Sequence, residues 1–172
     1  MDVQIHNHNI HHIGNLSDHP GLRKIDIAFN PIEDLRGIDQ CPQLRQLCVY
    51  GGGKLNDLTG IEGIKKLEVL LVQRNAITQL GLAFHPLTKL RELRADKNHL
   101  TSLGGDLSTC TSLRRLDLSH NQLTSLEGLA GLQSLEELRV ANNNIATFKH
   151  LRALPSLVEI DISYNKLKTL DG

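Results

Sequence analysis

Histidines crowd the start of the chain, and imidazole is the commonest metal ligand among side chains. His6, His8, His11 and His12 all precede position 13. Their spacing matches none of the zinc-binding patterns, and no cysteine lies beside them. We therefore favour a solvated polar end of the molecule over a metal site, and we expect neither metal nor cofactor.

A glycine run is the next candidate, because glycine-rich loops can wrap phosphate groups. Gly51-Gly52-Gly53 is followed by Lys54. A phosphate loop needs four residues between its glycines and a Ser or Thr after the lysine, and this run has neither. No nucleophile elbow, zinc-protease helix or dinucleotide-binding glycine pattern occurs elsewhere in the sequence. The sequence therefore predicts a protein without catalytic residues.

The sequence contains an internal repeat, and this repeat predicts the secondary-structure elements that carry the histidines and the glycine run. The unit reads L-x-x-L-x-L-x-x-N-x-L-x-x-L, and it starts at Leu22, Leu44, Leu67, Leu90, Leu113, Leu135 and Leu157. An eighth, partial copy precedes them, in which Val3 and Ile5 correspond to Ile25 and Ile27. The copies run from end to end, so we expect residues 1–172 to form a single domain.

Each copy predicts one short strand, because alternate residues of x-L-x-L-x point to opposite faces. One such strand cannot bury its apolar face alone, so the copies must stack into a parallel sheet. The later apolar positions return the chain along the other side, and the wider return side makes the stack curve. An asparagine recurs in the column Asn30, Asn75, Asn98, Asn121, Asn143 and Asn165. We interpret this column as structural, since its amides can satisfy turn backbone groups.

The unit resembles the leucine-rich repeat, and its length is similar to that of a 22-residue subclass. That subclass includes the regulatory subunit of type-one protein phosphatase, a spliceosomal protein, and ciliary or centrosomal proteins; bacterial internalins use a similar unit length. The resemblance implies an α/β-type solenoid of about eight repeats, the first and last incomplete. A parallel β-sheet would line its concave face, with 3₁₀ or irregular returns on the convex face.

The last copy stops at Leu170-Asp171-Gly172, without a returning apolar segment or a cap. Solenoids need polar caps to protect their ends. We therefore interpret the chain as a fragment of a longer protein that is open at its C-terminus. The alternative is end-to-end self-association through this uncapped repeat.

The cysteines bear on the compartment. Cys41 and Cys110 take equivalent inward positions three repeats apart, which is at least about 14 Å. A disulfide needs Cα atoms within about 7 Å. Cys48 alternates outward and is expected on the concave surface. Three cysteines without a framework spacing predict a reducing, intracellular and cytoplasmic location, with cilium, centrosome or cytoskeleton suggested by the resemblance alone.

Net charge, the length of apolar runs and the aromatic content limit the classes of partner that the protein can bind. Lys plus Arg is 19 and Asp plus Glu is 19, so the formal net charge is zero and no nucleic-acid partner is expected. No apolar run approaches the roughly 20 residues that span a bilayer, so no membrane partner is expected either. The chain has no Trp, two Tyr and three Phe, which disfavours an aromatic-lined small-molecule cavity.

The concave surface is the predicted site of function, and its two halves differ. The N-terminal half gathers apolar side chains from three neighbouring strands, bordered by two arginines. These residues are Phe29, Cys48, Tyr50, Val69 and Leu71, with Arg74 and Arg94 at the border. Contiguous exposed apolar surface with a polar rim marks interaction sites, so we predict a partner site here.

In the C-terminal half, outward residues of neighbouring strands alternate in sign. They are Arg94, Asp117, Arg139 and Asp161, with Tyr164 beside them. Adjacent opposite charges stabilise a sheet modestly, by about 0.2–1 kcal/mol per pair. We interpret them as a self-satisfied charge ladder, and a polar recognition surface is the alternative.

The sequence thus predicts a non-catalytic scaffold that binds a protein partner mainly on its concave face. Three alternatives stay open: an RNA-associated ribonucleoprotein module, a bacterial adhesin resembling internalins, and the repeat region of a larger enzyme. Balanced charges on the concave columns count against RNA. Unpaired cysteines and the lack of a signal peptide count against the adhesin.

Overall fold

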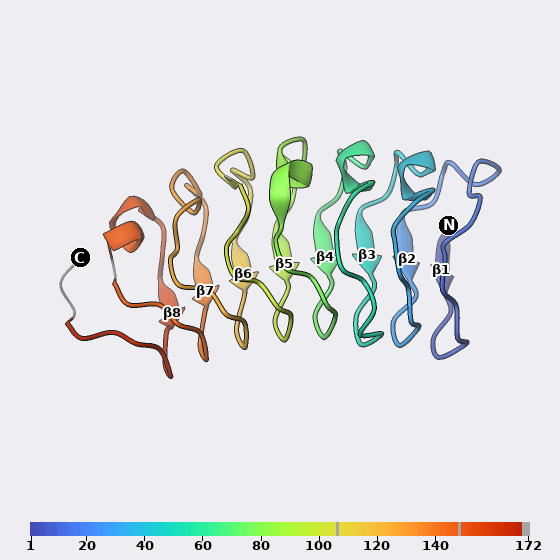
Figure 1. The fold of residues 1–172 in the computed structure, drawn as a ribbon. Helices are drawn as coiled ribbons and strands as arrows, with labels where there is room; N and C mark the ends of the chain where they lie inside the picture. The colour runs from blue at the N-terminus through green and yellow to red at the C-terminus, as the bar shows by residue number, and fades with distance from the viewer. Residues whose placement is uncertain (106, 148, 170–172) are drawn as a thin grey trace.

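The strands stack side by side in chain order. The computed structural model describes residues 1–105, 107–147 and 149–169. Within these residues, one parallel sheet holds eight strands that follow the order of the sequence (Figure 1). Their bounds are β1 Asp2–Gln4, β2 Lys24–Asp26, β3 Gln46–Cys48, β4 Val69–Leu71, β5 Glu92–Arg94, β6 Arg115–Asp117, β7 Glu137–Arg139 and β8 Glu159–Asp161. The predicted curved solenoid with a parallel sheet is confirmed.

The middle residue of each strand fixes the register. Leu47 of β3 pairs with Leu70 of β4, and Leu93 of β5 pairs with Leu116 of β6. These four leucines are at most 1% exposed. A slip of one residue would turn the leucines out and the charged neighbours in, so the apolar pattern specifies one register.

The returns lie behind the sheet and carry short 3₁₀ helices. Their bounds are η1 Ile38–Gln40, η2 Ile61–Gly63, η3 Gly81–Phe84 and η4 Lys149–Ala153. Figure 1 shows them along the upper border of the solenoid. The other described returns are turns. The prediction of 3₁₀ or irregular returns is therefore confirmed.

The asparagine column joins each repeat to the one before it. Asn121 Nδ2 donates to the carbonyl of Ala95 in the preceding repeat at 3.0 Å and to Leu118 O of its own repeat at 2.9 Å. Its Oδ1 accepts from Leu100 N at 2.9 Å. Asn98 makes the same set of bonds. The amides thus satisfy backbone groups that the tight turns would otherwise leave unpaired.

The residue before each asparagine position has a left-handed backbone, which the sequence analysis did not foresee. In chain order these residues are Asn7, Phe29, Gly51, Arg74, Lys97, His120, Asn142 and Tyr164, with φ between 54° and 81°. The following turn demands this conformation in every repeat, whatever the side chain. The side chains of this column therefore project at the rim of the concave face.

Glycine replaces asparagine once in the column, at Gly52. A Cβ atom there would lie 1.9 Å from the carbonyl oxygen of Asn30. The backbone of the third repeat therefore lies closer to the second repeat than any side chain at this position allows.

The core runs the length of the solenoid and opens at both ends. The inward leucines of the central repeats, such as Leu93, Leu116 and Leu118, are almost fully buried, as are Cys41 and Cys110, as predicted. At the first repeat Val3, Ile10 and Leu16 are only partly buried, and a hollow of about 100 Å³ lies among the apolar side chains there. Leu157, Ile160 and Leu167 are partly buried at the other end. Residues 170–172, where the expected uncapped end falls, lie outside the described residues.

Candidate functional site

The outer face of the sheet carries the first and third residue of every strand. In β4, Val69 and Leu71 are partly exposed, while Leu70 between them is fully buried. Each strand therefore offers two outward side chains, and the turn that follows offers two more. The surface is a set of columns, one residue per repeat, about 4.8 Å apart.

Four of the predicted apolar residues gather at β2–β4. The Phe29 and Tyr50 rings meet edge to face, with centroids 5.2 Å apart and planes at 77°. Phe29 is 52% exposed, and Tyr50, Val69 and Leu71 are partly exposed. We call these four residues the apolar patch.

Glycine makes the position of the Phe29 ring possible. A Cβ atom on Gly51 would lie 2.7 Å from Phe29 Cδ1, so the ring covers this glycine. The glycine run that suggested a phosphate loop therefore shapes the turn beneath an aromatic ring.

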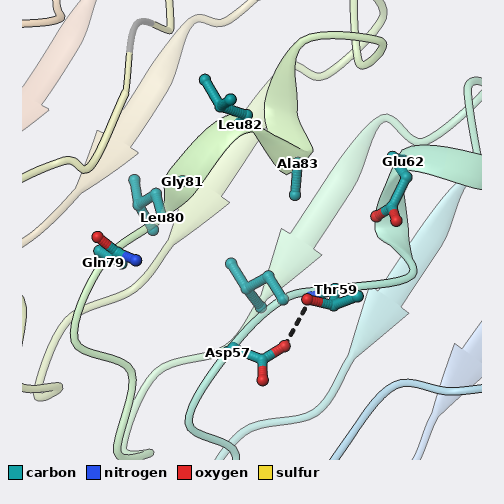
Figure 2. A pocket seen from close by; sticks show the side chains of 9 residues that line it. Asp57, Thr59, Glu62, Gln79, Leu80, Gly81, Leu82 and Ala83 are labelled. Carbon is teal, nitrogen blue, oxygen red and sulfur yellow. Dashed lines mark hydrogen bonds between the residues drawn. The ribbon is translucent and has the colours of Figure 1, made fainter.

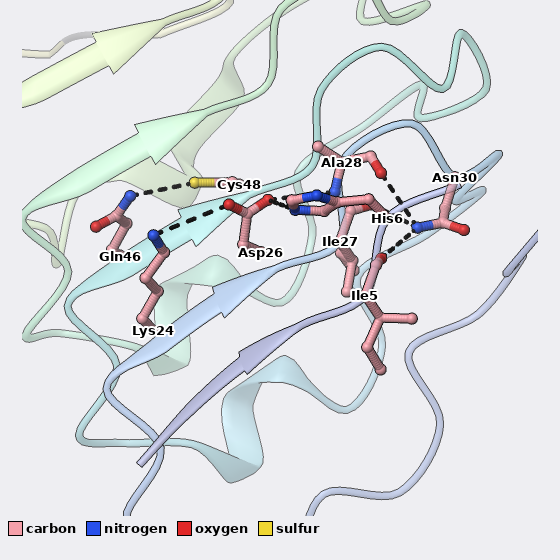
Figure 3. A network of polar contacts seen from close by, with 9 residues as sticks. All are labelled: Ile5, His6, Lys24, Asp26, Ile27, Ala28, Asn30, Gln46 and Cys48. Carbon is pink, nitrogen blue, oxygen red and sulfur yellow. Dashed lines mark hydrogen bonds and ion pairs between the residues drawn. The ribbon is translucent and has the colours of Figure 1, made fainter. Parts of the chain in front are cut away.

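The prediction that Cys48 is an exposed part of the patch is wrong, because its side chain is only 1% exposed. It points to the outer face but pairs in register with Asp26 on one side and Leu71 on the other. Gln46 lies over it and donates from Nε2 to Cys48 Sγ at 3.3 Å (Figure 3). A small side chain on a concave surface is covered by its larger neighbours. Burial raises the pKa of this thiol, which opposes a reactive thiolate.

Asp26 is at the centre of a polar network that the sequence analysis missed. His6 Nε2 lies 2.8 Å from Asp26 Oδ1, and Lys24 Nζ lies 3.9 Å from Oδ2 (Figure 3). Asp26 Oδ1 also accepts from Ala28 N at 3.4 Å. The repeat alignment could have predicted the contact between His6 and Asp26. It places His6 beside Ala28, which lies two residues beyond Asp26 on the same face.

Two further N-terminal histidines pair with carboxylates of the second repeat. His11 Nδ1 lies 3.0 Å from Glu33 Oε1, and His12 Nδ1 lies 3.3 Å from Asp34 Oδ2. The bond from His11 lowers the pKa of Glu33, and a hydrogen bond from Arg36 lowers the pKa of Asp34 to about 2. These histidines tie the first repeat to the second. In the described part of the chain, no three His, Cys, Asp or Glu side chains are placed to hold a metal ion.

In the C-terminal half the predicted ladder residues lie side by side but do not pair with one another. Register places Arg94 beside Asp117, and Arg139 between Asp117 and Asp161. The arginines instead turn to glutamates. Arg94 Nε lies 2.8 Å from Glu92, and Arg139 Nε lies 2.7 Å from Glu137.

The aspartates of this half serve the backbone. Asp117 Oδ1 accepts from Ser119 N at 3.0 Å, and Asp161 Oδ1 accepts from Ser163 N at 3.0 Å and Ser163 Oγ at 2.6 Å. These bonds lower the pKa of Asp161. Charges in this half are therefore satisfied within the face, but the predicted pairing of these arginines with these aspartates is wrong.

The rim holds two more of the predicted residues. Arg74 and Tyr164 both belong to the left-handed column, and Tyr164 is 81% exposed. Arg74 lies at the end of β4 beside the apolar patch, whereas Tyr164 lies four strands away, beyond β8. The structure therefore does not bring Tyr164 to the patch.

Two hollows lie between returns, away from the apolar patch. One, of about 390 Å³, lies between the return at Asp57–Glu62 and the return at Gln79–Ala83 (Figure 2). The other, of about 420 Å³, lies between the turns at Ser102–Gly105 and Glu127–Ala130. Both are shallow and mixed in polarity, and neither gathers a set of catalytic groups.

Known proteins share this fold. Residues 88–145 match a leucine-rich repeat profile, and residues 133–172 match a profile of two leucine-rich repeat copies. Internalin C2 of Listeria monocytogenes is similar at TM-score 0.84 and 24% identity, over 98% of this chain and 74% of that one. The comparison with curated proteins gave no match.

Two other solved structures are larger than this chain. The functional domain of InlJ from Listeria monocytogenes is similar at TM-score 0.78 and 26% identity, over 93% of this chain and 34% of that one. A leucine-rich repeat protein of Leptospira interrogans is similar at TM-score 0.65 and 24% identity, over 91% of this chain and 46% of that one. The chain thus spans less than half of these two structures.

The chain has the leucine-rich repeat fold, and its residues 88–172 match leucine-rich repeat profiles. This fold is generally a non-catalytic scaffold that binds protein partners, and the comparisons indicate no enzyme family. They do not single out the 22-residue subclass, and they lend no support to a ciliary or centrosomal location. No helix of the described residues is long and apolar enough to cross a membrane.

Proposed function

We propose that this protein is a non-catalytic scaffold that binds a protein partner on the N-terminal half of its concave face. One observation carries the proposal: the exposed Phe29 ring packs edge to face on Tyr50 beyond the ends of β2 and β3, and Val69 and Leu71 are partly exposed on the outer face of β4, the next strand. Burial of apolar area drives protein association, and Tyr and Arg are typical anchors of interfaces.

The C-terminal half is the weaker candidate surface. Arg94, Arg139 and the two aspartates are already bonded within the face. A partner would have to break these bonds, and exposed ion pairs return little in exchange. Arg94 borders both halves, so in this proposal it acts as an edge of the apolar patch.

Partner capture tests the proposal. Three proteins are compared in pull-downs from source-cell lysate, read by mass spectrometry: the wild type, Tyr50→Ala/Leu71→Arg in the patch, and the matched control Arg139→Ala/Tyr164→Ala. Circular dichroism first establishes that all three are folded. We expect one partner that the patch variant loses and the control retains. Loss in the control alone would assign the site to the C-terminal half.

The compartment follows from the thiols. Cys41 and Cys48 are free and buried. We propose an intracellular, cytoplasmic location, because these two free thiols suit a reducing compartment. Fractionation of source cells tests this.

An adhesin is the second candidate function, and the similarity to internalin C2 favours it. An adhesin would be found outside the cell and would bind a host-cell surface. Recovery of the protein from the medium or the cell surface of its source would support this candidate over the cytoplasmic scaffold.

We also propose that copies associate end to end. Partly exposed apolar side chains remain at the first repeat and at the last described one. A heterologous contact of this kind continues the sheet from one copy to the next. Light scattering over a range of concentrations should show a rising mass, and a constant monomer mass would contradict the contact.

A further inference from the structure

Basic residues gather where strands β2–β6 begin, although the net charge of the chain is zero. The four residues before each of these strands include seven cations and a single carboxylate, Glu68. The cations are Arg23, Arg45, Lys65, Lys66, Lys89, Arg91 and Arg114. All are exposed except Lys66, which is partly buried.

Few of these cations are neutralised. Glu68 pairs with Arg45 and lies 4.0 Å from Arg91, so its charge is shared between two arginines. Arg114 lies 3.2 Å from Glu136. In the described part of the chain, Arg23, Lys65 and Lys89 have no ion-pair partner. The start of the strands is therefore a positive edge beside Val69.

The opposite side of the patch is positive as well. Arg74 and Lys97 follow β4 and β5 in the left-handed column, with φ of 57° and 56°, and both are exposed. Neither forms an ion pair with a described residue. The apolar patch thus lies between two sets of free cations that are eight or nine residues apart in the chain of one repeat, which is at most about 30 Å at about 3.3 Å per residue.

The carboxylates of this half do not offset these cations. Asp26 is 8% exposed and is held by His6 and Lys24, and Glu92 is held by Arg94. Asp96 is partly buried, and burial together with Asp117 raises its pKa. On β2–β5 and the turns that directly follow them, Asp96 is therefore the remaining carboxylate without an ion pair in the described residues, beside the free cations Arg74 and Lys97.

We propose that the partner segment of this surface is acidic at both ends of an apolar block. The apolar block covers Tyr50, Val69 and Leu71. One acidic end meets Lys65 and Lys89, and the other meets Arg74 and Lys97. This inference rests on the proposed function and names the chemistry of the partner at the same site.

A protein segment fits better than a nucleic acid. Val69 and Leu71 are aliphatic and suit aliphatic anchors, whereas single-stranded nucleic acid needs open aromatic faces on which to stack. The Phe29 and Tyr50 rings are packed against each other.

Defined probes test the proposal by fluorescence anisotropy. The first is a peptide of about ten residues, long enough to span the two cation sets when extended, with leucines flanked by glutamates. The second has glutamine in place of each glutamate, and the third is an oligouridylate. Each is titrated at about 50 mM and about 300 mM salt, because exposed ion pairs are screened at the higher concentration.

Two variants separate this inference from the proposed function. Lys65→Gln/Lys89→Gln removes free charge from exposed positions, and Arg152→Gln/Lys168→Gln is its matched control at the C-terminal end. Leu71→Arg disrupts the patch itself. We expect the glutamate peptide to bind about tenfold more tightly than the glutamine peptide at low salt, with about a fivefold loss in Lys65→Gln/Lys89→Gln and none in the control.

Any other outcome contradicts the acidic partner, the apolar site or both. If both peptides bind equally and only Leu71→Arg weakens them, the proposed apolar site stands and the acidic partner is wrong. If neither peptide responds to any variant, both proposals fail. If the oligouridylate binds more tightly than the glutamate peptide, the surface recognises nucleic acid instead.

Discussion

The two halves of the concave face are built on one backbone but differ in how their charges are used. In the C-terminal half, Arg115 and Arg139 share Glu137, and the aspartates bond to the turns. In the N-terminal half, apolar side chains replace part of this network, and cations nearby stay free. A repeat scaffold therefore sets where side chains project, while ion pairing on the outer face, within a strand and between strands, decides which of them remain available to a partner.

The largest effect on stability is expected at Gly52, where the N-terminal half has glycine in place of the asparagine that the C-terminal half keeps. Gly52→Asn would restore the consensus asparagine, yet its Cβ would lie 1.9 Å from Asn30 O. We expect a loss of about 2–3 kcal/mol in the free energy of unfolding, measured by urea denaturation, because backbone must move. Gly53→Asn is the control, since a Cβ there meets nothing within 4 Å and asparagine tolerates its φ of 71°. A stable Gly52→Asn protein would show that the third repeat has no tight approach.

The unbroken part of the asparagine column gives the converse case. Asn121→Ala removes an amide that bonds to Ala95 O, Leu118 O and Leu100 N. Buried backbone groups would be left unpaired, so we expect a loss of about 2 kcal/mol in the same measurement. Gln122→Ala, an exposed neighbour, should change the free energy of unfolding by less than about 0.5 kcal/mol. Equal effects of the two changes would argue against the column as a stabilising element.

Charge pairing in the C-terminal half can be removed on its own. Glu137→Gln removes the ion pairs that this carboxylate forms with Arg115 and Arg139. Because the pairs are exposed, their loss should lower the free energy of unfolding by only about 0.5 kcal/mol. The C-terminal half would then resemble the N-terminal half in free charge. We expect the variant to gain salt-sensitive binding of the glutamate peptide, whereas Glu127→Gln on a return should not. No gain would mean that the apolar patch, rather than free cations, makes the difference.

The smallest effect is a contrast between two aspartates. Burial raises the pKa of Asp96, so its ionisation weakens the fold as pH rises through the raised pKa; Asp96→Asn should stabilise by about 0.5 kcal/mol or less at neutral pH. Ser163 lowers the pKa of Asp161, so its contribution is present above the ordinary carboxyl pKa and is lost as pH falls. Asp161→Asn should therefore destabilise slightly at neutral pH. Thermal melts at pH 7 and near pH 3 check both signs, and both differences should shrink in acid.

The sequence predicted the backbone better than the surface. The repeat positions of Leu116, Leu118 and Asn121 recur at nearly fixed spacing along the chain, so strand, core and turn follow from one pattern. The outer face needed more than alternation. Cys48 was placed outward, but its exposure depends on the size of Gln46 and Leu71. Arg139 was matched with its cross-strand neighbours, but its guanidinium turns to Glu137 on its own strand. Such choices depend on rotamers that no spacing rule contains.

Chain order and spatial order coincide in this sheet, and that bears on how the protein is made. Asn98, Asn121 and Asn143 each reach back 25 or 26 residues to bond with a carbonyl of the preceding repeat. Each newly synthesised repeat therefore finds its docking surface already present on the nascent chain. At about 5–20 residues per second, a ribosome would release one repeat every few seconds, which is far slower than local packing. The solenoid can grow during translation, one repeat at a time.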